Sequence, residues 1–172
     1  GAVGLSAVMA AVIAGCTTII GIDVRPARLE LARELGATHT IDAGAVADVV
    51  EEVRRLTGGG AAGTLETTGV PRVLRTAVDA LAPAGTCGVI GAPALGTEVA
   101  LDVNNILAYG RIVRGIVEGD SIPELFVPSL LEQWRLGRFP VERMMTFYDF
   151  DRINDAVRDA EEGTTIKPVL RM

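Results

Sequence analysis

The chain has 172 residues, a length that fits one main folding unit and is enough to bury a sizeable core. Apolar residues make up 49% of the chain and charged residues 22%, a composition that excludes an intrinsically disordered protein. The formal net charge is −6 and no run of Lys or Arg is long enough to follow a phosphate backbone, which argues against nucleic-acid binding because phosphate contacts need basic side chains.

Helical and extended patterns alternate along the chain, and glycines separate many of them. Pro26 stands where a first helical turn accepts proline, while Gly36 and Gly58 stand where helices end. In chain order we expect a helix over 5–14, a strand over 18–23, a helix over 27–35, a strand over 38–41, a helix over 46–56, a strand over 64–67, a helix over 72–81, a strand over 86–90, a helix over 104–109 and a strand over 111–117.

The C-terminal part begins with a helix that we expect over 121–136, and Ser121 with Glu124 has the spacing of a capping box at its start. A strand over 144–150, a helix over 151–162 and a strand over 166–170 follow. Strands that alternate with amphipathic helices predict right-handed crossovers and a parallel sheet covered on both faces. The expected fold class is therefore α/β with a doubly wound sheet, followed by a short C-terminal α+β segment.

Two glycines and one acid form a candidate nucleotide-binding pattern. Gly1 and Gly4 open the first helix, and Asp23 ends the next strand, which matches the last two glycines and the acid of a G-x-G-x-x-G turn. Such glycines let the backbone approach a pyrophosphate, and the helix N-terminus offers free N–H groups to it. A carboxylate at the strand end accepts ribose hydroxyls and repels a 2′-phosphate. A tight turn beside a surface acid is the alternative interpretation.

Several longer segments carry a family resemblance across essentially the whole chain. They are Gly-Ala-Val-Gly-Leu-Ser-Ala-Val-Met-Ala-Ala (1–11), Ile-Ile-Gly-Ile-Asp (19–23), Arg-Leu-Glu-Leu-Ala-Arg-Glu-Leu-Gly-Ala-Thr-His (28–39), Leu-Glu-Thr-Thr-Gly (65–69), Gly-Val-Ile-Gly-Ala-Pro (88–93), Gly-Ile-Val-Glu-Gly-Asp (115–120) and Ile-Lys-Pro-Val-Leu-Arg (166–171). In these segments the chain resembles the zinc-dependent medium-chain alcohol dehydrogenases, and most of all their aryl-alcohol (benzyl-alcohol) branch.

The resemblance implies NAD as the cofactor and assigns residues to its adenosine half. Gly1, Val3 and Gly4 lie in the segment that matches the glycine fingerprint. Asp23 matches the ribose-binding acid, and Arg28 matches the basic residue beside the adenosine ribose.

The nicotinamide half is assigned in the same way. Thr68 and Gly69 match a loop near the cofactor, and Ile90, Gly91 and Ala92 match the strand end that holds the nicotinamide ring and amide.

Two further positions and a dimer contact follow from the same resemblance. Val117 lies on the matching nicotinamide-side strand, and Lys167 matches a basic position that reaches the pyrophosphate. The strand over 111–117 resembles the one that pairs across a dimer axis in the family. A homodimer, or a tetramer of such dimers, is implied.

The chain also departs from the family pattern. The first fingerprint glycine, the central strand before it and the catalytic domain with its Cys, His and Cys zinc ligands are not in this sequence. We expect either an incomplete chain, or a swapped or displaced strand in the gap, because a central strand is hydrogen-bonded on both edges. The expected domains are residues 1–137, which bind the dinucleotide, and residues 138–172, which in the family return to the catalytic domain.

A replacement metal site is not expected within this chain. Catalytic zinc needs three protein ligands, whereas this sequence has one His, two distant Cys and no C-x-x-C motif. We interpret His39 as a histidine at the sheet rim, and Cys16 and Cys87 as small buried hydrophobes. Two cysteines provide no disulfide framework, so a cytoplasmic location is the default. The apolar stretch over 1–13 has no basic flank and is too short to span a membrane.

The leading hypothesis is the NAD-binding portion of a zinc-dependent alcohol dehydrogenase that oxidises a primary, aryl alcohol to its aldehyde. Zinc is expected only in the complete enzyme, and this chain alone is expected to hold no catalytic residue and to be inactive. The alternative is a non-catalytic nucleotide-binding or assembly module without metal. A zinc-free quinone-reductase relative that uses NADPH is disfavoured because Asp23 would repel the 2′-phosphate. No nucleic-acid or membrane partner is expected.

Overall fold

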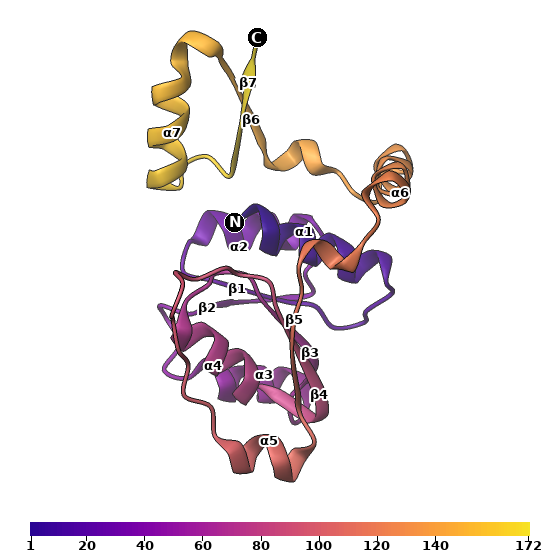
Figure 1. Cartoon of the computed structure of the whole chain (residues 1–172), viewed down its shortest axis with the longest axis vertical. Coiled ribbons are helices and arrows are strands. Elements are labelled where there is room, and N and C mark those ends of the chain that lie inside the picture. Colours follow the sequence, from indigo (N-terminus) through magenta and orange to yellow (C-terminus); the bar gives the residue numbers. More distant parts are fainter.

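The computed structural model describes residues 1–172, and helices alternate with strands throughout. The elements are α1 (Ala2–Ile13), β1 (Ile20–Asp23), α2 (Pro26–Glu34), β2 (His39–Asp42), α3 (Val49–Thr57), β3 (Ala61–Glu66), α4 (Pro71–Asp79), β4 (Leu81–Val89), α5 (Val103–Tyr109), β5 (Ile112–Gly115), α6 (Pro123–Arg135), β6 (Met145–Asp149), α7 (Ile153–Glu162) and β7 (Lys167–Arg171). Figure 1 shows them in chain order. None of the helices combines the length and the apolar character needed to cross a membrane.

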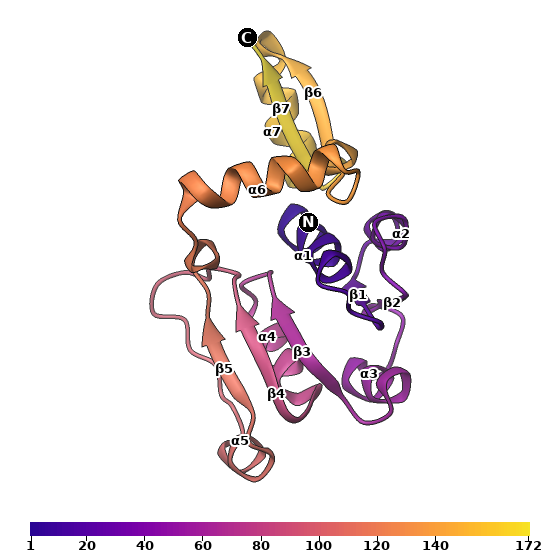
Figure 2. The same cartoon turned by 90° about the vertical axis from the view of Figure 1, so that its right-hand side faces the viewer.

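All strand pairs are parallel, but they form three separate sheets. β1 pairs with β2, β4 lies between β3 and β5, and β6 pairs with β7. β1 and β3 share no ladder, and Figure 2 shows them as neighbours of α1 on either side of a break in the sheet. The expected gap is therefore present, and none of the seven strands is displaced into it.

Local sequence signals set several element ends. Pro26 occupies the first turn of α2, where its missing N–H has no consequence. The Asp48 side chain accepts hydrogen bonds from the N–H groups of Val50 and Glu51, so α3 begins at Val49 and not at the expected Val46. Gly58 ends α3 in the left-handed conformation with φ of 73°.

The expected capping box at the start of α6 is not formed. The N-cap is Ile122, Pro123 is the first helical residue, and the Ser121 hydroxyl donates instead to the Glu118 carbonyl oxygen at 2.7 Å. Proline at the first helical position has the required φ and no N–H to satisfy. Ser121 therefore belongs to the preceding turn, and the prediction was wrong.

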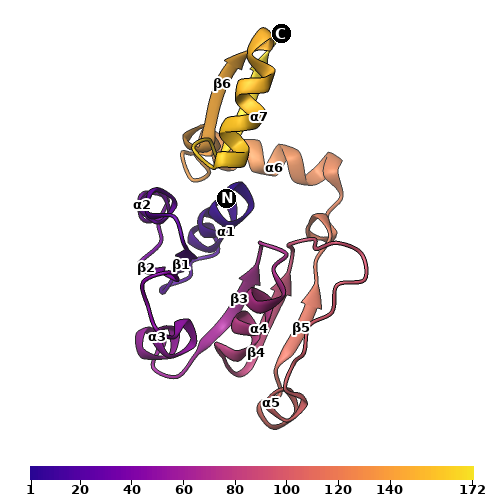
Figure 3. The ribbon, with the colours of Figure 1, turned by 90° about the vertical axis from the view of Figure 1, so that its left-hand side faces the viewer.

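The largest apolar cluster joins the N-terminal helices to the C-terminal part of the chain. Its buried members are Leu5, Val8, Met9, Ile19, Ala32, Leu35, Ala37 and Met144. Ile166, the residue before β7, packs against the same cluster. The strand–helix–strand unit of β6, α7 and β7 is thereby anchored on the side of α1 and α2, as Figure 3 shows.

The two cysteines differ in their surroundings. Cys87 lies in β4 and is 0% exposed, as expected for a small buried hydrophobe. Cys16 is exposed, so the same expectation was wrong for it. It directly follows Gly15, whose φ of 78° turns the chain away from α1.

We expect the folded chain to expose one reactive thiol. Burial raises the pKa of the Cys87 thiol, and the nearby Glu66 charge raises it further although a hydrogen bond to Thr64 opposes both effects. A disulfide-exchange reagent should therefore titrate Cys16 rapidly in buffer and both thiols in denaturant, and Cys16→Ser should abolish the rapid reaction. Rapid reaction of two thiols in buffer would contradict this packing of β4.

Candidate functional site

The residues of interest gather where parallel strands end. Ile90 N–H donates to the Glu66 carbonyl oxygen, and Ile116 N–H to that of Val89, so β3, β4 and β5 end side by side. Figure 2 shows that these ends point towards the start of α1. The chain passes from β2 at an outer edge back to β3, and ligands of open α/β sheets bind where strand order reverses in this way.

Asp23, at the end of β1, presents one oxygen to the chain and leaves the other open. Its Oδ1 accepts the N–H groups of Val24 at 2.8 Å and Arg25 at 3.0 Å. Its Oδ2 accepts no hydrogen bond and lies 3.8 Å from both the Gly1 nitrogen and Arg28 Nη1. The carboxylate is thus held in one orientation with a free acceptor facing the start of α1.

Arg28 lies beside the free oxygen of Asp23. Its Nη1 faces Asp23, while its Nε is buried and has no hydrogen-bond partner. Buried polar atoms normally find partners. An open carboxylate oxygen beside a guanidinium group can bind the hydroxyls of a sugar, so these residues fit the ribose of a dinucleotide.

Close backbone approaches connect α1 to the end of β3 and the end of β3 to that of β4. A Cβ atom on Gly4 would lie 3.2 Å from Thr67 Oγ1. A Cβ atom on Gly91 would lie 2.1 Å from the Gly69 nitrogen, and one on Gly69, whose φ is 71°, would lie 3.1 Å from Ala92 backbone atoms. The start of α1, the loop after β3 and the end of β4 therefore lie against one another and form one cradle. The N–H groups of the loop and of the β4 end already donate to Glu66, whereas those at the start of α1 have no partner within the helix, as a pyrophosphate requires.

Two of the expected site residues are not joined to this cradle by any contact. Val117 lies just beyond β5 and is 76% exposed. Lys167 opens β7 with an exposed side chain, and only its neighbour Ile166 packs against the cluster that contains α1. Their assignments stay predictions.

Sequence reasoning missed three residues of this region. Glu66 is 2% exposed and its carboxylate accepts hydrogen bonds from Thr68 and Gly69. Thr67 faces Gly4, and Arg25 Nη1 donates at 2.5 Å to the Glu162 carbonyl oxygen at the end of α7. A Glu followed by Thr-Thr-Gly at a strand end was a usable signal for the first two. Arg25 has none, because its partner is 137 residues away.

The remaining candidate residues behave as expected for rim and surface groups. His39 is exposed at the start of β2, with Nδ1 3.0 Å from the Thr38 hydroxyl. No group of three or more His, Cys, Asp or Glu side chains is arranged to hold a metal ion. The residues of this chain therefore do not fit a catalytic zinc.

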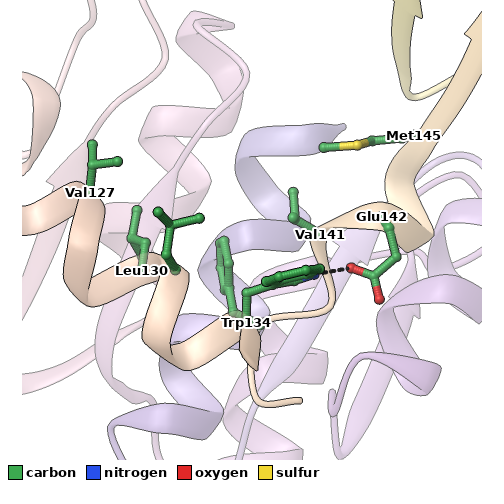
Figure 4. A pocket seen from close by; sticks show the side chains of 8 residues that line it. Val127, Leu130, Trp134, Val141, Glu142 and Met145 are labelled. Atoms are coloured by element: carbon green, nitrogen blue, oxygen red, sulfur yellow. Dashed lines mark hydrogen bonds between the residues drawn. The ribbon is translucent and has the colours of Figure 1, made fainter. Parts of the chain in front are cut away.

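An apolar pocket of about 420 Å³ lies away from these residues, between α6 and the segment before β6 (Figure 4). Trp134 Nε1 donates to Glu142 Oε2 at 2.9 Å across its rim. It is lined by Val127, Leu130, Leu131, Trp134, Phe139, Val141, Glu142 and Met145. None of these residues belongs to the strand-end cradle.

Comparison with known proteins gives consistent results. Residues 2–132 match the family model described as zinc-binding dehydrogenase. The geraniol dehydrogenase of Castellaniella defragrans is 42% identical over 170 residues, which cover 99% of this chain and 46% of that protein. Among solved structures, the alcohol dehydrogenase zinc-binding domain protein from Burkholderia ambifaria is 54% identical with a TM-score of 0.98. The matched region covers 100% of this chain and 46% of the Burkholderia chain.

The benzyl alcohol dehydrogenase from Acinetobacter calcoaceticus is as similar to this chain in structure as the Burkholderia protein is. It is 44% identical with a TM-score of 0.98, over 100% of this chain and 47% of that one. The chain thus spans about half the length of the relatives that it matches. These structural neighbours confirm the expected α/β fold class.

Proposed function

The chain belongs to the zinc-binding dehydrogenase family, and from this we propose that it is the NAD-binding portion of an alcohol dehydrogenase. One observation carries the proposal. Asp23 keeps a free oxygen beside Arg28 and Gly1, and Gly4, in the first turn of the helix that follows Gly1, lies against the loop after β3. An extended dinucleotide needs such a sugar acceptor at one end and the free N–H groups of a helix N-terminus for its phosphates.

In this proposal the chain's residues bind and orient. Asp23 and Arg28 receive the adenosine ribose, and the N-terminus of α1 at Gly1, Val3 and Gly4 faces the pyrophosphate. The backbone of Thr68, Gly69, Ile90, Gly91 and Ala92 holds the nicotinamide, with Val117 on the adjoining strand end and Lys167 directed to the pyrophosphate. A bound nicotinamide accepts the hydride, so orientation and electrostatics are the protein's contribution.

The substrate and the metal belong to the proposal for the whole enzyme. The similarity to a benzyl alcohol dehydrogenase supports a primary, aryl alcohol that is oxidised to its aldehyde. The three zinc ligands that such catalysis needs are not supplied by the side chains of this chain. A metal-free nucleotide-binding or assembly module is the alternative role for the chain by itself.

Assembly, location and domain division are part of the same proposal. β5 is an edge strand with an exposed Ile112 and Val113, which supports pairing with a second copy in a homodimer or a tetramer of dimers. The separate β6–β7 sheet supports a division into residues 1–137 and 138–172. A cytoplasmic location stays a prediction from composition.

The test is a calorimetric titration of the 172-residue chain with NADH and with NADPH, combined with an assay for benzyl alcohol oxidation. We expect micromolar binding of NADH, about 100-fold weaker binding of NADPH because Asp23 repels a 2′-phosphate, and no turnover. Absence of binding for both nucleotides would refute the NAD site. Oxidation of benzyl alcohol by the 172-residue chain alone would refute the proposal that this chain holds no catalytic residue.

A further inference from the structure

Glu66 carries a buried carboxylate that has no part in the proposed NAD site as described above. It is the last residue of β3 and is 2% exposed. Its Oε1 accepts the Thr68 N–H at 2.6 Å, the Gly69 N–H at 3.1 Å and the Thr68 hydroxyl, while Oε2 lies 3.2 Å from the same Gly69 nitrogen.

The hydrogen-bond pattern shows that every neighbour donates to this carboxylate. Oε1 already accepts the N–H groups of Thr68 and Gly69, so in its contact with the Thr68 hydroxyl the hydroxyl donates. The hydroxyl oxygen in turn accepts the Val70 N–H at 3.1 Å. A carboxylate that only accepts hydrogen bonds is the ionised form. Glu66 therefore carries a negative charge inside the protein.

This charge has no cationic partner. None of the ion pairs in the structure includes Glu66. The N–H dipoles of Thr68 and Gly69, just before α4, stabilise the charge without neutralising it. Buried charges are usually paired, and an unpaired one acts strongly on its surroundings.

The charge lies against the strand end assigned to the nicotinamide. A Cβ atom on Gly91 would be 2.7 Å from Glu66 Oε2, and the Gly91 N–H donates to the Glu66 carbonyl oxygen at 3.0 Å. The nicotinamide ring is a cation when oxidised and neutral when reduced. A fixed negative charge at this place distinguishes the two states.

We propose that Glu66 is a positioning residue with an electrostatic role: it orders the 67–69 loop, and its charge favours the oxidised over the reduced nicotinamide cofactor. This inference rests on the proposed NAD site and adds the selection of redox state to it. The adenosine half is shared by both redox states, so the effect is confined to the ratio of their affinities.

The test compares Glu66→Gln with Glu66→Asp in the 172-residue chain. Glutamine has nearly the same shape and keeps an Oε1 acceptor for the three donors, but it lacks the charge. Aspartate keeps the charge and is too short to keep all the loop contacts. Circular dichroism checks folding, and calorimetry gives the dissociation constants of NAD⁺, NADH and ADP-ribose.

For Glu66→Gln we expect the ratio of the NAD⁺ to the NADH dissociation constant to rise about fivefold, as for one charge acting across a partly screened distance. ADP-ribose affinity should not change. For Glu66→Asp we expect both cofactors to weaken together and the ratio to stay as in the unsubstituted chain.

An unchanged ratio in folded Glu66→Gln would leave only a structural role and overturn the inference. A raised ratio in Glu66→Asp, which keeps the charge, would overturn the inference as well. Failure of the unsubstituted chain to bind any of the three ligands would overturn the proposed function itself.

Discussion

Replacement of Asp23 with serine is expected to raise the affinity for NADPH relative to NADH by about 100-fold, which corresponds to about 2.7 kcal/mol. The substitution removes the negative charge that would face a 2′-phosphate. It leaves Arg28, whose Nη1 lies 3.8 Å from the carboxylate, free to bind that phosphate. Calorimetric titration of both reduced cofactors into the variant measures the change.

Asp102→Ser is the matched control for this substitution. Asp102 also accepts two backbone N–H groups, those of Asn104 and Asn105, but it caps α5 at the other end of the sheet (Figure 1). Its loss should weaken α5 slightly and leave the cofactor preference as it was. An equal preference in Asp23→Ser and the unsubstituted chain would remove Asp23 from the ribose site.

Gly91→Ala is expected to abolish measurable dinucleotide binding and to lower the free energy of unfolding by about 3 kcal/mol. The new Cβ atom would lie 2.1 Å from the Gly69 nitrogen and 2.7 Å from the Thr68 nitrogen, which are backbone atoms that cannot turn away as a side chain does. The loop after β3 must then separate from the end of β4. Thermal unfolding and NADH titration report the two losses.

Gly63→Ala provides the control within the neighbouring strand. A Cβ atom there meets only the Thr86 carbonyl oxygen at 3.8 Å, an ordinary contact. This variant should bind NADH as the unsubstituted chain does, with a small change in stability. If Gly91→Ala behaves like Gly63→Ala, the close approach of the two strand ends has no part in binding.

Local chemistry made much of the fold predictable. Proline at the start of α2, the glycine after α3 and the alternation of apolar patterns act over a few residues, so element type and order follow from the sequence. Element ends were less certain. At α3, the cap at Asp48 and not the apolar pattern from Val46 sets the first helical residue. At α6, Pro123 and not the expected cap at Ser121 sets it.

The site was predictable in part for the same reason. Asp23 is recognisable at a strand end, and its two backbone hydrogen bonds are local. The role of Glu66 was missed because burial, which turns a surface acid into an unpaired internal charge, depends on the packing of β4 against β3. Tertiary packing also left Cys16 exposed and Cys87 buried.

The sequence by itself thus determined the α/β alternation, the family and the acid at the end of β1 that we propose as the ribose ligand, since these depend on residue type and short spacing. Only the tertiary structure decided that β1 and β3 do not pair and that Gly91 packs against Gly69 and Glu66. The contact between Arg25 and the end of α7 also depends on it. These contacts join segments far apart in the chain. Their formation depends on how the layers pack, which no local pattern encodes.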